Sequence, residues 1–154
     1  MPETTDKLMA LADGLVKALG EGEFSLPFMV EWIDNPIVEL ADPELRAPRV
    51  WVVDFAEKQE TVHGIPIEEF ELLLVVQKKF QPTEITAEEC RKLSGLVSEI
   101  TSFCRNTPIV VDGDESVCVK IERERARDFK EYHEKLLFRA EISTHWQKVG
   151  ADDE

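Results

Sequence analysis

The sequence lacks the patterns by which disulfide frameworks, zinc sites and membrane spans are usually recognised. Its three cysteines, Cys90, Cys104 and Cys118, form no Cys-x-x-Cys pair, and an odd number cannot pair completely within one chain. We therefore expect reduced, mostly buried thiols, as in a protein made in a reducing cytosol. No apolar run reaches the roughly 18 residues of a membrane span, and the polar start Met1–Lys7 is unlike a signal peptide. No membrane partner is expected.

Positive charge is also scarce. The chain has 18 Lys and Arg residues against 32 Asp and Glu residues, so its formal net charge is −14. Binding to nucleic-acid phosphates needs Lys and Arg to replace counterions, and this balance excludes a basic binding patch. The 154 residues, 43% of them hydrophobic, fit one domain over residues 1–154 with a real core, frayed at residues 1–5 and 150–154.

Catalytic signatures are missing as well. His63, His133 and His145 lie far apart, outside any metal-ligand pattern, and are expected at the surface or at strand ends. There is no Gly-x-Ser-x-Gly elbow and no glycine-rich phosphate loop. The segment Asp112–Glu115 lacks the order of a calcium loop and is predicted to be a solvated turn. We therefore predict no catalytic residue, no metal site, no bound cofactor and no enzyme activity.

Two segments have apolar residues at the three- and four-residue spacing of an amphipathic helix. The first is Leu8–Leu19, which Gly20 and Gly22 should end because glycine adopts a positive φ easily. The second is Cys90–Cys104, which follows the capping-box sequence Thr86–Glu89. Both helices should bury one stripe.

Five further segments have the alternating apolar pattern or the β-branched and aromatic content of strands. They are Phe24–Ile33, Arg49–Phe55, Ile67–Phe80, Val117–Glu122 and Leu136–Thr144. The resulting order α-β-β-β-α-β-β predicts an α+β fold: a mostly antiparallel sheet with two helices packed on one face. The residues predicted to be buried in its core are Leu15, Leu72, Leu74, Leu96, Ile100, Val119 and Phe138.

The strand Ile67–Phe80 is apolar on both faces. Alternate residues from Phe70 to Val76 share one face, and Leu73 and Val75 share the other. A strand that is apolar on both sides is covered on both sides. Since the helices cover one face, a neighbouring subunit is the simplest cover for the second. The predicted subunit-interface residues are Leu73, Val75, Arg139 and Glu141.

Several segments in a fixed order resemble one family of phage proteins. They are the helix Leu8–Leu19, then Phe24-Ser-Leu-Pro-Phe, Asp42-Pro-Glu-Leu-Arg before the strand Arg49-Val-Trp-Val-Val, the segment Phe70–Lys79 ending in Val75-Val-Gln-Lys-Lys, a helix of the type Leu93-x-x-Leu-Val-x-Glu-Ile, and the strand Leu137–Thr144. In this order they resemble the tail-terminator, or tail-completion, proteins of long-tailed bacteriophages. The resemblance covers about Leu8 to Trp146, and the chain departs from it in His145-Trp146 and an acidic tail.

The resemblance implies a structural virion protein in the tail and neck region, synthesised in the host bacterial cytoplasm. Such proteins form a six-membered ring on the head-proximal end of the tail tube, stop its polymerisation and provide the docking surface for the head and neck. The implied partners are further copies of the chain, the tail tube protein and a head-closure or neck protein. DNA would pass through the lumen without specific binding, which suits an acidic chain.

The segment Ala56–Pro66 is polar and reads as a long hairpin arm between two apolar strands. A connection of this length is uncommon in a compact domain unless it is functional or disordered. The resemblance implies that such an arm reaches the tail tube, so we expect it to be mobile until it docks. The predicted tail-tube contacts are Glu57, Lys58, Glu60, Val62, His63 and Ile65, with Gly64 and Pro66 shaping the tip.

Two other functions remain open at this stage. The first is another phage neck or head-closure component, which would bind the portal side and not the tube. The second is a small cytosolic α+β enzyme or ligand-binding domain, for which a concave pocket with converging polar groups would be the discriminating feature.

Overall fold

The computed structural model describes residues 6–33, 47–79, 86–111, 113–124 and 137–149. This part of the chain folds into two helices and one six-stranded sheet of strand order β1-β2-β3-β6-β5-β4. The elements are α1 (Lys7–Glu21), β1 (Met29–Trp32), β2 (Arg49–Val62), β3 (Ile65–Lys79), α2 (Thr86–Asn106), β4 (Ile109–Val111), β5 (Asp114–Glu124) and β6 (Leu137–Lys148). Neighbouring strands are antiparallel except β1 and β2, which are parallel. The predicted α+β class is confirmed; the ends expected to fray, residues 1–5 and 150–154, and His133 lie outside the described residues.

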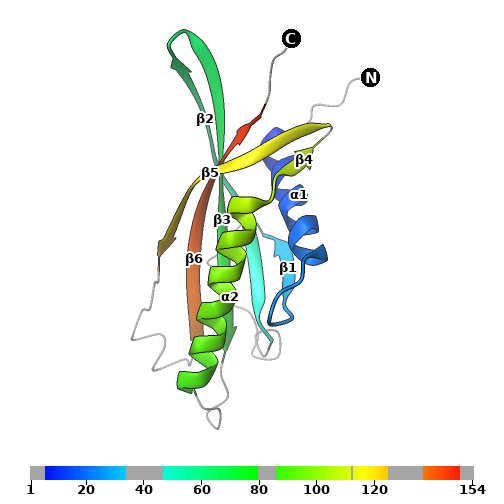
Figure 1. Cartoon of the computed structure of the whole chain (residues 1–154), viewed down its shortest axis with the longest axis vertical. Helices are drawn as coiled ribbons and strands as arrows, with labels where there is room; N and C mark the ends of the chain where they lie inside the picture. The colour runs from blue at the N-terminus through cyan, green and yellow to red at the C-terminus, as the bar shows by residue number, and fades with distance from the viewer. Residues whose placement is uncertain (1–5, 34–46, 80–85, 112, 125–136, 150–154) are drawn as a thin grey trace.

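Both helices pack on the same face of the sheet (Figure 1). The core lies between them and the central strands, where alternate residues of β3 from Phe70 to Val76 are buried together with Ala140 and Ile142 of β6. Helix α1 contributes Leu11, Ala12, Leu15 and Leu19, and α2 contributes Cys90, Leu93, Leu96, Val97, Ile100 and Cys104. The apolar stripes therefore predicted the packing face of each helix correctly.

The hairpin of β2 and β3 extends beyond the helical layer and is the most protruding feature of the described fold (Figure 1). The hairpin arm predicted over Ala56–Pro66 is present, but the strands continue farther into it than predicted, because they pair without a gap up to Val62 and Ile65. A two-residue turn closes them, with φ of 52° at His63 and 79° at Gly64. Positive φ at both turn positions follows the twist of the flanking strands, so the arm is paired almost to its end.

One predicted core residue is exposed. Val119 has 48% of its surface accessible, whereas the other six are buried. The register of β5 against β6 shifts between Cys118 and Lys120, so Val119 is the extra residue of a β-bulge. A bulge moves the following residues to the opposite face, which simple alternation cannot anticipate.

The start of the first predicted strand is also different. Only Met29–Trp32 of the segment Phe24–Ile33 forms β1, while the rings of Phe24 and Phe28 stack at 5.2 Å and Phe24 packs 5.5 Å from Phe103 of α2. Gly22 ends α1 with φ of −77°, so a positive φ is not the reason for glycine here. A Cβ at this position would lie 2.8 Å from the Phe24 ring, so the close aromatic packing requires its absence.

Candidate assembly surfaces

The face of the sheet opposite the helices is made of side chains that alternate with the core residues. The strand register places Trp51, Val75 and Glu141 in one row across β2, β3 and β6, and Val53, Leu73 and Ser143 in the next row. Trp51 and Val75 are 1% and 0% exposed, yet neither belongs to the helix-facing core. We call this surface the helix-free face. Within the described residues no helix packs on it.

The four predicted interface residues all lie on the helix-free face. Val75 is buried, Leu73 is half-buried, and Arg139 donates from Nη2 to Oε2 of Glu141 at 3.4 Å. The structure thus brings these four together.

Sequence reasoning missed a second ion pair on the helix-free face. Arg49 of β2 donates to Glu31 of β1, and Trp51 Nε1 donates to the same carboxylate oxygen at 3.3 Å. Gln77 of β3 lies between Arg49 of β2 and Arg139 of β6 and is 3% exposed. Its Nε2 is the one buried side-chain nitrogen or oxygen atom among the described residues that has no hydrogen-bond partner. The alternation of Arg49, Trp51 and Val53 could have signalled this face.

The end of the helix-free face nearest the hairpin is acidic and hydrogen-bonded. His145 lies near the end of β6, one of the two positions expected for it, but it is not at the surface: it is buried, and its Nδ1 lies 3.0 Å from Oε2 of Glu69. Gln147 donates to the other oxygen of Glu69 at 3.1 Å, and Ser143 donates to Glu71 at 2.9 Å. Burial opposes ionisation of Glu69, but the hydrogen bonds with Gln147 and His145 outweigh it and lower the pKa of this carboxyl.

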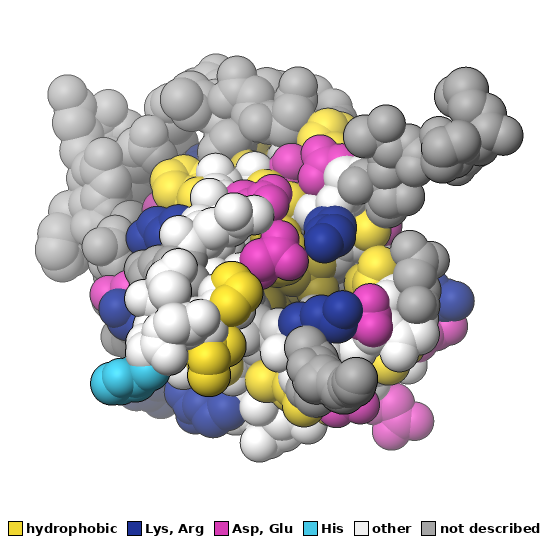
Figure 2. All heavy atoms as spheres, turned by 90° about the horizontal axis from the view of Figure 1, so that it is seen from above, with side chains coloured by type: hydrophobic (Ala, Val, Ile, Leu, Met, Phe, Trp, Pro, Cys, Tyr) yellow, Lys and Arg dark blue, Asp and Glu magenta, His cyan; other side chains and the backbone are white. Residues whose placement is uncertain are grey.

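The hairpin is the second candidate surface. At its tip Val62 and Ile65 are 41% and 63% exposed, and His63 between them is exposed as well. Glu57 and Lys58 lie exposed farther down β2; of Glu60 the structure describes the backbone alone. Figure 2, seen along the long axis from the hairpin end, shows hydrophobic and charged side chains close together at this end of the molecule. The predicted tube-contact residues therefore share one projecting element.

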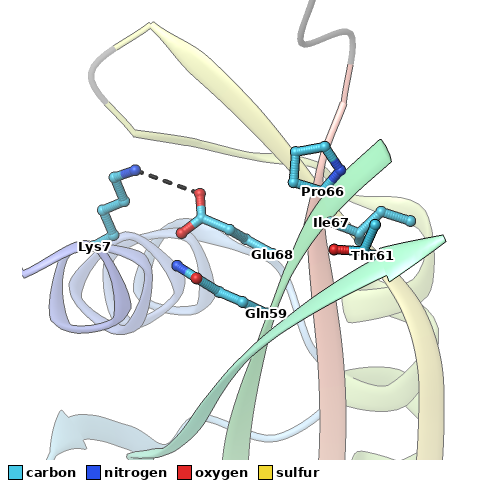
Figure 3. A pocket seen from close by; sticks show the side chains of 6 residues that line it. All are labelled: Lys7, Gln59, Thr61, Pro66, Ile67 and Glu68. Atoms are coloured by element: carbon cyan, nitrogen blue, oxygen red, sulfur yellow. Dashed lines mark hydrogen bonds and ion pairs between the residues drawn. The ribbon is translucent and has the colours of Figure 1, made fainter. Parts of the chain in front are cut away.

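The part of the hairpin near its turn approaches the start of α1 at a shallow hollow. Lys7 Nζ lies 3.4 Å from Oε1 of Glu68, and Gln59, Thr61, Pro66 and Ile67 complete the lining (Figure 3). Both charged groups are substantially exposed, so their attraction is screened by water and salt. The hollow is a junction between two elements, and its two charged groups, Lys7 and Glu68, pair with each other.

The described residues hold no cluster of three His, Cys, Asp or Glu side chains that could bind a metal ion. The three thiols are free, as predicted, and Cys90 and Cys104 are buried. Burial, with a smaller effect of nearby Cys118, raises the pKa of the Cys104 thiol to about 12, which keeps it protonated and unreactive. In the described part of the chain, no helix is long and apolar enough to cross a membrane.

Comparison with known proteins defines the fold and no more. No protein-family model and no curated protein sequence matches the chain. A solved protein that bears no functional name is similar over 98% of this chain and 100% of its own length, with 13% identity and a TM-score of 0.52. A chain from the virion of a native gene transfer agent particle is similar over 92% of both chains, with 8% identity and a TM-score of 0.45. The first likeness shows that the whole described architecture, helices and sheet together, occurs as one fold elsewhere.

Proposed function

We propose that this protein is a structural component of a bacteriophage virion, without enzyme activity, that caps the head-proximal end of the tail tube as a ring of six copies. In this role it stops tube polymerisation and provides the docking surface for the head and neck. The observation that carries the proposal is that one small domain has two separate surfaces suited to assembly, the helix-free face and the projecting hairpin. A cap needs one surface for its neighbours in the ring and another for the tube.

The helix-free face supports contact between subunits. Its half-buried Leu73 lies beside Trp51 and Val75, which are buried within the subunit, and ion pairs border them, Glu31 with Arg49 and Arg139 with Glu141. Apolar centres bordered by polar groups are typical of subunit interfaces. A ring forms when such a patch meets a different patch on the next copy and the rotation closes.

The hairpin supports contact with the tube. It projects from the body, its tip exposes Val62 and Ile65, and a paired two-stranded arm needs less ordering on binding than a loop of the same length. The acidic composition supports the third element of the role, because a lumen built from a chain of net charge −14 offers DNA few phosphate ligands.

The direct test is negative-stain electron microscopy of the purified protein mixed with tail tubes assembled in its absence. We expect a ring at one end of each tube and tubes that no longer elongate. Binding to portal complexes in place of tubes would assign the protein to head closure. A protein that remains a closed dimer both in solution and in the virion would contradict the ring.

A further inference from the structure

The outer edge of β2 is open along most of the hairpin. Strand β1 pairs with β2 over Arg49–Val52, and the last contact between them is the bond from Trp32 Nε1 to Oδ1 of Asp54 at 2.7 Å. Beyond Asp54, no strand in the described part of the chain pairs with the outer edge of β2 up to Val62. Among the described residues, the backbone groups on this stretch of the edge have no strand partner.

The turn fixes which backbone groups face outward. In an antiparallel hairpin closed by two residues, the flanking pair Val62 and Ile65 exchanges both backbone bonds, and every second pair does so from there. The N–H and C=O groups of Thr61, Gln59 and Glu57 therefore point away from β3. They form three donor–acceptor sets about 7 Å apart along the edge.

The opposite edge of the hairpin, along β3, cannot offer the same row of outward N–H and C=O groups. Thr61 pairs with Pro66, whose outward position on β3 has no N–H to donate. Three residues farther on, from Glu69, β3 is already paired with β6. Proline on an exposed edge prevents strand addition, so one edge of the arm is closed and the other is open.

We infer that the open edge of β2 receives an extended segment of the tail tube protein, which adds a strand to the hairpin through Glu57, Gln59 and Thr61. This inference rests on the proposed function and specifies how the hairpin binds. Main-chain bonds would hold the segment, and side-chain pockets would select it. The exposed Phe55 and Val62 near the two ends of the edge favour apolar residues there, and Glu57 favours a Lys or Arg opposite it.

Charge favours a different protein over a second copy as the added strand. Two copies of this chain bring net charges of −14 each to the contact. Like charges across neighbouring strands are destabilising, whereas a segment with basic residues gains from Glu57 and from the field of the whole protein. A dimer of the free protein joined through this edge would overturn the inference.

Amide hydrogen exchange of the full chain, followed residue by residue by NMR, tests the edge directly. In the free protein, exchange should be fast at Glu57, Gln59 and Thr61 and slow at the alternate residues Lys58 and Val62. On addition of assembled tail tubes, the three fast amides should become protected. Protection confined to the tip, with the edge still exchanging fast, would overturn the inference.

A pair of substitutions at one residue gives the matched test. Gln59→Pro removes an outward N–H and breaks no bond within the hairpin, whereas Gln59→Ala keeps the N–H and removes the side chain. We expect about tenfold or greater loss of tube binding for Gln59→Pro and a change below about twofold for Gln59→Ala. Thr61→Pro should repeat the effect of Gln59→Pro, and circular dichroism must show both proline variants folded.

The outcomes separate the two proposals. If the wild-type protein does not bind tubes, the proposed function and the strand addition both fall. If Val62→Ser with Ile65→Ser abolishes binding but folded Gln59→Pro and Thr61→Pro bind normally, the hairpin remains the docking element and strand addition is wrong. Equal losses for Gln59→Ala and Gln59→Pro would likewise assign the contact to the side chain and overturn the backbone role.

Discussion

Leu73 and Leu74 are consecutive residues of β3 that distinguish folding from assembly. Leu74 is fully buried on the helix side, whereas Leu73 lies half-buried on the helix-free face between Val53 and Ser143. Truncating each leucine to alanine removes the same atoms from opposite faces of one strand. The comparison therefore isolates the role of the face from the chemistry of the side chain.

The two substitutions should act at different levels. Leu74→Ala should lower the free energy of unfolding by about 2–5 kcal/mol, because the helices and strands around it cannot fully close the cavity. Leu73→Ala should cost the isolated subunit about 1 kcal/mol or less, since part of its side chain already meets solvent. In the ring, burial of the remaining half of this leucine would contribute about 0.8–1.5 kcal/mol, so Leu73→Ala should weaken each subunit contact about fourfold to tenfold.

Urea denaturation of the free subunit measures the first level, and sedimentation of the protein with tail tubes measures the second. Leu74→Ala should unfold at a lower urea concentration than the wild type but form rings at temperatures where it is folded. If Leu73→Ala destabilises the subunit as much as Leu74→Ala and still caps tubes normally, the helix-free face is a second core of the chain. The subunit-interface argument would then be wrong.

Three further outcomes follow from single features of the structure. Leu96→Ala in α2 should lower the free energy of unfolding, measured by urea denaturation, by about 2–5 kcal/mol. Val119→Ala at the bulge should change it by less than about 0.5 kcal/mol. Equal effects of the two substitutions would show that the bulge is misplaced. Gly64→Ala should destabilise the hairpin by about 1 kcal/mol through its positive φ alone, because a Cβ there meets no atom within 4 Å, and faster exchange of the tip amides would report it. Hydrogen bonding from Lys78 lowers the pKa of Glu89, and the pKa of Glu69 is lowered too. Both carboxylates therefore stabilise the fold at pH values above their ordinary pKa of 4.5 and lose this contribution as the pH falls through their pKa values in the folded protein. Glu69→Gln and Glu89→Gln should flatten the loss of thermal stability measured from about pH 5 downwards.

The parts of the fold that were predictable are those in which one face of an element is buried. The apolar stripes that include Leu15 and Leu96 in the helices, and the apolar residues at every second position from Phe70 in β3, follow directly from burial. Apolar residues recur with the period of the element wherever one face is buried. The same logic found that β3 is apolar on both sides. It also placed both helices on one face, which the structure confirms.

The paired strands of the hairpin arm and the burial of His145 were not predictable, for two different reasons. The residues between Ala56 and Pro66 bury no face, so their strands leave no apolar period, and the sequence indicated an arm without indicating that its two sides are strands. His145 is buried through a hydrogen bond with Glu69, 76 residues away along the chain. A polar pair at that separation carries no local sequence signal, because either residue alone resembles a surface position.

The interface residues show where sequence periodicity stops being informative. Leu73 and Val75 alternate with Leu72 and Leu74, so the sequence states that they share a face, and the strand register adds Trp51 and Glu141 to that face. Periodicity does not state what covers the face, because a helix of the same chain and a neighbouring subunit select the same apolar side chains. The edge of β2 is different: its outward amides are set by the turn and by Pro66, and both can be read from chain order once the hairpin is known. Backbone geometry thus specifies the proposed tube contact more sharply than side-chain composition specifies the proposed ring contact, and the paired substitutions at Gln59 test it at one atom.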